Sequence, residues 1–202
     1  MEKGIKSKRR ILEIAFRLFA AYSYPDVSYS LLEEATGISR GSMVYYFGNK
    51  EGIFRAVVET FLYNSSNARS VDPKKRGGLK EFYEAFAASV DKELKELKPY
   101  KITNLSSARL NIERSALQFI PEFKEYAHKV QQEDSKVWLT VVETAVANGE
   151  LKSDTDIPAT AALFQQVSYG WLSSGVYNES QQKEGTKGLK RLFNHLYALV
   201  RA

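Results

Sequence analysis

Apolar residues recur along this chain at intervals of three and four, which is the spacing of one face of an α-helix. The clearest faces lie in 53–61, 79–97, 123–145 and 189–200. No sustained alternation of the kind that marks a β-strand interrupts them. The pattern therefore predicts an all-α fold made of amphipathic helices.

Turn-forming residues divide this pattern into two parts. The stretch 64–78 is polar and rich in Asn, Ser, Pro and Gly, as linkers tend to be. We expect a small N-terminal domain over residues 1–52, followed by a connecting helix at about 50–66. A larger helical domain is expected over residues 74–202.

The segment between residues 28 and 52 has the signals of two short helices joined by a tight turn. Ser28 can cap a first short helix, and Gly37 follows at the turn, where a positive φ is cheap without a Cβ. Ser39 can cap a second short helix. This arrangement is the geometry of a helix-turn-helix, whose second helix enters the major groove of DNA. The sequence thus predicts an N-terminal three-helix DNA-binding domain.

The second helix carries side chains suited to DNA. An arginine fork can pair with guanine or phosphate, small residues let the backbone approach closely, and tyrosine hydroxyls can reach phosphates. Asn49 can cap the following helix, whose first turn presents a lysine, and a helix N-terminus with a lysine suits phosphate. Although the two adjacent tyrosines could be core residues, both cannot face inward on one helix. The expected DNA-binding residues are Ser28, Ser39, Arg40, Gly41, Ser42, Tyr45, Tyr46 and Lys50.

This run of residues resembles the DNA-binding signature of the TetR family of transcription regulators. The resemblance covers Thr36 to Phe54 and extends to a first helix at Ile11 to Phe19. It implies a helical ligand-binding and dimerisation domain behind the DNA-binding domain, a homodimer, and a small molecule that releases DNA. Glu33 departs from the family pattern, which usually has a small residue beside the turn.

Composition adds to this picture without deciding it. The net charge of +5 suits a polyanionic partner, and residues 6–10 form a basic cluster that can touch phosphate. The chain has no cysteine, which excludes disulfides and thiolate chemistry. No stretch is apolar over the roughly 18 residues that a membrane span needs. We expect a cytoplasmic protein.

Polar residues on apolar faces of the C-terminal helices point to a small-molecule site. Asp134 stands within the apolar stripe of its helix, and a buried carboxylate needs a partner. Either Arg109 or Arg114 pairs with it, or a ligand does, unless it is simply exposed or salt-bridged. Aromatic residues on the apolar faces of these helices are more often core residues than ligand contacts, although ligand pockets are also lined by aromatic side chains. The candidate ligand-binding residues are Phe86, Arg109, Asp134, Trp138 and Tyr169, for an apolar or aromatic effector with a polar end.

The last two apolar helices are expected to form the dimer interface. The final one carries a strong apolar stripe, which must be covered and which consists of Leu189, Leu192, Phe193, Leu196, Tyr197 and Val200. A dimer made this way would read a roughly palindromic DNA site.

Two other classes of function remain as alternatives. The small domain could dock a protein partner, in which case binding would lack the steep salt dependence of DNA binding. An all-helical enzyme is the other, but the sequence has no catalytic constellation, cofactor motif or phosphate loop, and His128 and His195 match no metal spacing. The favoured hypothesis is a ligand-responsive transcriptional repressor without a cofactor.

Overall fold

A computed structural model of the protein describes residues 2–63, 68–98, 102, 104–178 and 183–202. Helices make up the regular structure of these ranges, and the extended pairing found there is an isolated bridge between Leu151 and Arg201. The all-α prediction is therefore confirmed. No helix in the described ranges is both long and apolar enough to cross a membrane. Part of the expected linker, residues 64–67, lies outside the described residues.

The chain folds into two compact units. Unit 1 comprises Met1–Ser65 and Leu97–Lys124, and unit 2 comprises Ser66–Glu96 and Glu125–Ala202. Residues 97–124 thus group with the N-terminal helices, whereas the sequence had placed them in a C-terminal domain over 74–202.

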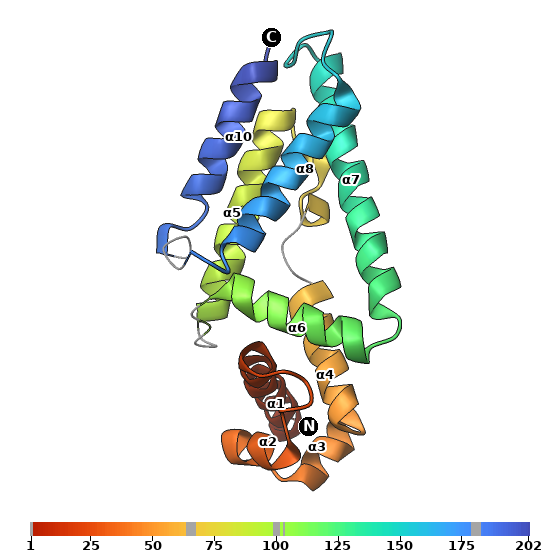
Figure 1. Ribbon diagram of the computed structural model, residues 1–202, viewed down its shortest axis with the longest axis vertical. Coiled ribbons are helices and arrows are strands. Elements are labelled where there is room, and N and C mark those ends of the chain that lie inside the picture. Colours follow the sequence, from red (N-terminus) through yellow and green to blue (C-terminus); the bar gives the residue numbers. More distant parts are fainter. Residues whose placement is uncertain (1, 64–67, 99–101, 103, 179–182) are drawn as a thin grey trace. The chain divides into compact units, whose positions relative to one another are not determined.

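Unit 1 contains five α-helices and a π-helical turn among its described residues. In chain order these are α1 (Glu2–Ala21), α2 (Tyr29–Thr36), α3 (Arg40–Phe47), α4 (Lys50–Val58), the π-helix η1 (Glu59–Tyr63) and α6 (Leu105–Phe119). The first three pack on one another, α3 is followed directly by α4, and α6 contacts α1 and α4. Figure 1 shows α2 and α3 as two short helices beside the longer α1. A three-helix arrangement with a helix-turn-helix is therefore present.

Side chains close in sequence begin the short helices of unit 1. The Ser28 hydroxyl accepts from the Leu31 N–H at 3.1 Å, and Asn49 accepts from the Gly52 N–H at 2.8 Å. Gly37 ends α2 in the left-handed region at φ 67°. These caps and this turn are the ones that the sequence predicted, and they fix where α3 starts.

Polar anchors explain why α6 belongs to unit 1. The Asn111 amide donates to the carbonyl of Ala20 in the last turn of α1 at 2.8 Å, and the Ser115 hydroxyl accepts from the Tyr24 N–H at 3.2 Å. Between them the face of α6 that carries Ile112 is buried. The linker composition around 64–78 marks one chain crossing between the units, but it carries no information about these long-range contacts.

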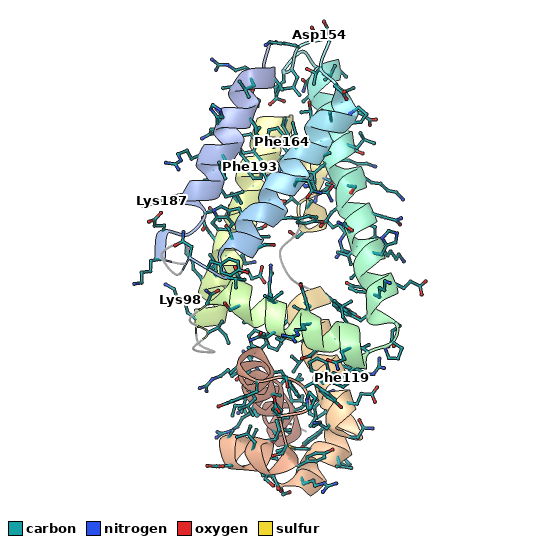
Figure 2. All side chains as sticks on the ribbon, in the orientation of Figure 1. Lys98, Phe119, Asp154, Phe164, Lys187 and Phe193 are labelled. Carbon is teal, nitrogen blue, oxygen red and sulfur yellow. The ribbon has the colours of Figure 1, made fainter. Side chains whose placement is uncertain are left out.

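Unit 2 is a helical bundle around an aromatic core. Its helices are α5 (Leu79–Leu97), α7 (Phe123–Ala147), α8 (Ile157–Ser174) and α10 (Lys187–Val200), with two short 3₁₀ turns, η2 (Ala68–Ser70) and η3 (Pro73–Lys75), before α5. The described core of the bundle includes Phe86, Trp138, Phe164 and Phe193, one from each helix. Phe164 and Phe193 stack with ring centroids 5.4 Å apart and are labelled in Figure 2. Four helices thus meet through large, rigid side chains.

Candidate nucleic-acid interface and buried polar cluster

The helix α3 presents one face outward. Arg40, Gly41, Val44 and Tyr45 are exposed, whereas Met43 is buried on the opposite side. Positions i, i+1, i+4 and i+5 share one side of a helix, so these four residues form a continuous surface. The sequence had not singled out Val44, although its spacing of four from Arg40 places it on this face. An apolar side chain there suits contact with a thymine methyl group.

Arg40 starts α3 and is held by two residues of α2. Its backbone N–H donates to the Glu33 carboxylate at 2.5 Å. Its guanidinium lies over the Tyr29 ring, 4.4 Å from the centroid. Glu33, which departs from the usual family pattern, therefore satisfies an unpaired N–H at the start of α3 and ties the two helices together.

The two adjacent tyrosines of α3 divide their roles. Tyr45 is 83% exposed, so it belongs to the outward face. Tyr46 is half-buried, and its hydroxyl lies 3.3 Å from where a side chain on Gly4 would begin. The start of α1 therefore packs beside Tyr46. Tyr45 is the one of the pair that a DNA molecule could reach without rearrangement.

Ser39 and Ser42 support the start of α3. Ser39 is exposed and Ser42 half-buried, and their hydroxyls lie 3.2 Å apart. The Ser39 hydroxyl also accepts from the Ser42 N–H at 3.4 Å, which makes it the cap of α3. Ser28, at the start of α2, is exposed as well.

Two basic residues near this surface serve the protein's own packing. The Lys50 ammonium donates to the Tyr24 carbonyl at 3.0 Å and lies 4.3 Å from the centroid of the Tyr24 ring. Partial burial lowers the pKa of Lys50 below its usual value. Arg10, from the basic cluster 6–10, donates to the Thr36 carbonyl at the end of α2 at 2.9 Å. Both side chains therefore stabilise unit 1, whatever else they contact.

Unit 2 contains a buried carboxylate. Asp134 on α7 is only 2% exposed. It accepts from the backbone N–H of Arg69 at 3.1 Å and from the Tyr169 hydroxyl at 3.1 Å, and the Arg69 Nε lies 3.6 Å away. Its arginine partner is thus Arg69, not Arg109 or Arg114 as the sequence had suggested. Arg69 lies in the segment that was interpreted as linker, so helix periodicity could not identify it.

The Asp134 cluster extends through polar groups of α7 and α8. The Gln165 amide donates to the Tyr169 hydroxyl at 3.2 Å, and the Ser135 hydroxyl donates to Gln165 at 2.8 Å. Burial raises the pKa of the Asp134 carboxyl above its usual value, against the opposing effect of the Arg69 N–H. Burial and then the nearby Asp134 raise the pKa of Tyr169 to about 12. We call Arg69, Asp134, Ser135, Gln165 and Tyr169 the Asp134 cluster.

The other candidate ligand residues lie elsewhere. Phe86 and Trp138 are buried in the aromatic core, with ring centroids 5.8 Å apart. Arg109 is in α6 and belongs to unit 1. The structure therefore brings Asp134 and Tyr169 into direct contact and assigns Phe86 and Trp138 to packing within unit 2.

The stripe expected at the dimer interface is mostly internal. Leu189 and Phe193 are fully buried, and Leu196 and Val200 pack against the core of unit 2. Leu192 is the exposed member of the expected stripe, at 43%. Outside the stripe, Leu199 on α10 is 59% exposed and Leu163 on α8 is 54% exposed. The helices of unit 2 itself therefore bury most of the stripe that was expected to be covered by a second copy.

A capped, outward-facing second helix after a tight turn defines a helix-turn-helix DNA-binding protein. The comparisons agree: residues 11–57 match the model of the family described as bacterial regulatory proteins, tetR family. Residues 11–57 are therefore similar to the DNA-binding domain of this family of bacterial regulators.

Similar proteins extend the likeness over the whole chain. The HTH-type transcriptional repressor AcnR of Corynebacterium efficiens is 28% identical over 201 residues, covering 99% of this chain and 95% of that protein. The solved structure of Salmonella enterica GusR has the same fold at a TM-score of 0.61, with 21% identity and 96% of each chain covered. A TetR-family regulator from Cytophaga hutchinsonii also reaches 0.61, at 19% identity, covering 100% of this chain and 98% of that one.

Proposed function

We propose that this protein is a homodimeric repressor that reads a palindromic operator with the outward face of α3 and is released by a small molecule bound in unit 2. The observation that carries the proposal is the exposed face of α3, where Arg40, Val44 and Tyr45 stand together. These side chains offer a guanine-pairing fork, an apolar contact for thymine and a hydroxyl for phosphate. The similarity to a named repressor supports repression over activation.

Gly41 gives this proposal independent support. A Cβ on Gly41 would meet no atom within 4 Å, so the protein's own packing does not require glycine there. Glycine inside a helix costs about 0.5–1 kcal/mol relative to alanine. A close approach by another molecule accounts for this cost, and a DNA backbone lying against the start of α3 is such a molecule.

We place the dimer contact on the exposed leucines of α8 and α10. Leu192 and Leu199 are seven residues apart and so share one side of α10, and α8 contacts α10 within the bundle. Around Leu163, the exposed residues of α8 include Ala159, Ala162 and Gly170, which are small enough for a second copy to approach closely. An exposed apolar surface of this kind is typical of a protein interface. Two copies related by a two-fold axis would present two α3 helices to a symmetric site.

The test begins with the selection of binding sites from random DNA by the purified protein, followed by footprinting. The expected result is a symmetric site whose half-sites are one helical turn apart or a multiple of it. Leu199→Glu should give folded monomers in sedimentation and lose binding to this site. Thr144→Glu is the matched control, because it adds the same charge to an exposed position of α7. A single isolated half-site, or a dimeric Leu199→Glu protein, would contradict the proposal.

The Asp134 cluster is the proposed effector site. Asp134 accepts a hydrogen bond from Tyr169, and a ligand with a hydroxyl or amine could take the place of that donor. Effector binding would then exchange one hydrogen bond at Asp134 for another and move α8 relative to α7.

A ligand library screened by thermal shift tests the effector site. A true effector should raise the Tm of the protein, since it binds the folded state, and should release DNA. Asp134→Asn should abolish that shift, whereas Thr144→Ala, on the exposed side of the same helix, should retain it. An effector whose thermal shift survives Asp134→Asn unchanged would place the site elsewhere.

A further inference from the structure

Unit 1 contains a pocket of about 570 Å³ that the proposed function does not use. Its described lining comes from the second half of α1, the last turn of α2 and the start of α6, together with Tyr22 and Ile102 outside these helices, and includes no residue of α3. The Asp134 cluster lies in the other unit. Volumes of roughly 300–1,000 Å³ are typical of small-molecule sites. The pocket is therefore large enough for a ligand of its own.

The charge in the described lining of this pocket is positive. Arg17 is the charged residue among the described lining residues, and it forms no hydrogen bond or ion pair with any residue that the structure describes. Tyr22, Asn104 and Ser107 add polar groups, while Ile14 and Leu18 contribute apolar surface. Arg17 is exposed, and no carboxylate in the described part of the chain pairs with it. Such a guanidinium favours an anion, and it suits a planar carboxylate in particular.

We propose that this pocket is a second small-molecule site, which binds a compact organic carboxylate with its charged end on Arg17 and its apolar body against Leu18 and the alanines of α1. We call it the Arg17 pocket. The inference goes beyond the proposed function, because it needs neither an operator nor an effector in unit 2.

The position of the Arg17 pocket connects it to the DNA-reading helix. Ala35 in its wall directly precedes Thr36, whose hydroxyl donates to the Leu32 carbonyl at 2.7 Å and accepts from the Ile38 N–H at 3.0 Å. Thr36 thereby holds the turn that leads into α3. A ligand that contacts α1, α2 and α6 together stabilises their packing, because it binds only when they are assembled.

The test uses benzoate as the probe and benzamide as its neutral counterpart. NMR titration of the full-length protein measures the affinity for each. Benzoate should bind at millimolar concentration or better, and at least tenfold more tightly than benzamide. Arg17→Gln should weaken benzoate binding at least tenfold. Arg114→Gln is the matched control, because it removes one exposed arginine of α6 that does not line the pocket, and it should leave binding unchanged.

A second pair of variants keeps the test independent of charge. Ala35→Leu fills the pocket from an exposed position and should block benzoate, whereas Ala88→Leu, at an exposed position of α5, should not. Absence of benzoate binding to the unmodified protein would overturn the proposal. The proposal would also be overturned if Arg17→Gln bound benzoate as tightly as the unmodified protein does, or if Asp134→Asn abolished benzoate binding. DNA binding measured without benzoate tests the proposed function separately. The pocket proposal and the proposed function can therefore fail independently.

Discussion

In unit 1 each short helix starts at a side chain only a few residues from the group that it caps, as Ser28, Ser39 and Asn49 show. In unit 2 the interior is built by rings that are distant in sequence, with Trp138 packing against both Phe86 and Phe193. The first kind of structure is specified locally and leaves one face of α3 free. The interior of unit 2 is specified by long-range packing, which buries the apolar faces of its helices. Unit 1 therefore exposes a helix face, whereas unit 2 encloses an aromatic interior.

The largest expected effect follows from the interior of unit 2. Phe193 is fully buried among aromatic rings, so Phe193→Ala should lower the free energy of unfolding by roughly 3–5 kcal/mol. Its neighbour Leu192 is 43% exposed, and Leu192→Ala should have a much smaller effect on folding. Chemical denaturation of the two variants at the same protein concentration measures the difference. Equal losses would show that α10 is not divided into an inner and an outer face.

On the exposed surface of unit 1, the expected effect is on binding instead of folding. Arg40→Ala should weaken binding to the selected operator by roughly 1–3 kcal/mol, with a smaller loss on random DNA, if Arg40 reads a base. Lys50→Ala should weaken binding to all sequences alike and lower the salt slope by about one unit if its ammonium reaches a phosphate. Titrations of both DNAs over a range of salt concentrations test this pair. An Arg40→Ala loss of the same size on both DNAs would make Arg40 a backbone contact only.

A smaller effect is expected at the caps of unit 1. Ser39→Ala removes the acceptor at the start of α3 and should cost roughly 0.5–2 kcal/mol of stability. Glu33→Gln keeps an oxygen near the Arg40 N–H and should cost less. Thermal unfolding of the two variants provides the comparison. A Ser39→Ala protein as stable as the parent would show that the Glu33 contact alone holds this helix end.

The Asp134 cluster predicts a dependence of stability on pH. Because burial raises the pKa of Asp134, the folded state holds its proton more tightly than the unfolded state does. This contribution to stability is present below the unfolded value of 3.8 and is lost as pH rises through the higher folded value. Asp134→Asn removes it, so the variant should gain stability relative to the parent between pH 3.5 and pH 7. A constant difference in unfolding free energy across this range would contradict the prediction.

The same contrast explains what the sequence could and could not predict. The capping residues, the Gly37 turn and the position of α3 depend on neighbours within a few residues, so periodicity and turn chemistry located them. Arg69, the partner of Asp134, is distant in sequence and lies in a segment that has the composition of a linker. The burial of Phe193 and the exposure of Leu199 on one helix depend on how the bundle closes, which an amphipathic pattern does not specify.

The central claim is that the outward face of α3 exists to contact DNA, and Gly41 offers its most direct test. Gly41→Leu adds a side chain at an exposed helix position where a Cβ meets no protein atom within 4 Å. We predict that the free protein becomes slightly more stable, by about 0.5–1 kcal/mol, because glycine is a poor helix former. Its affinity for the selected operator should fall at least tenfold, because the side chain obstructs the DNA. Unchanged operator affinity in a folded Gly41→Leu protein would contradict the claim.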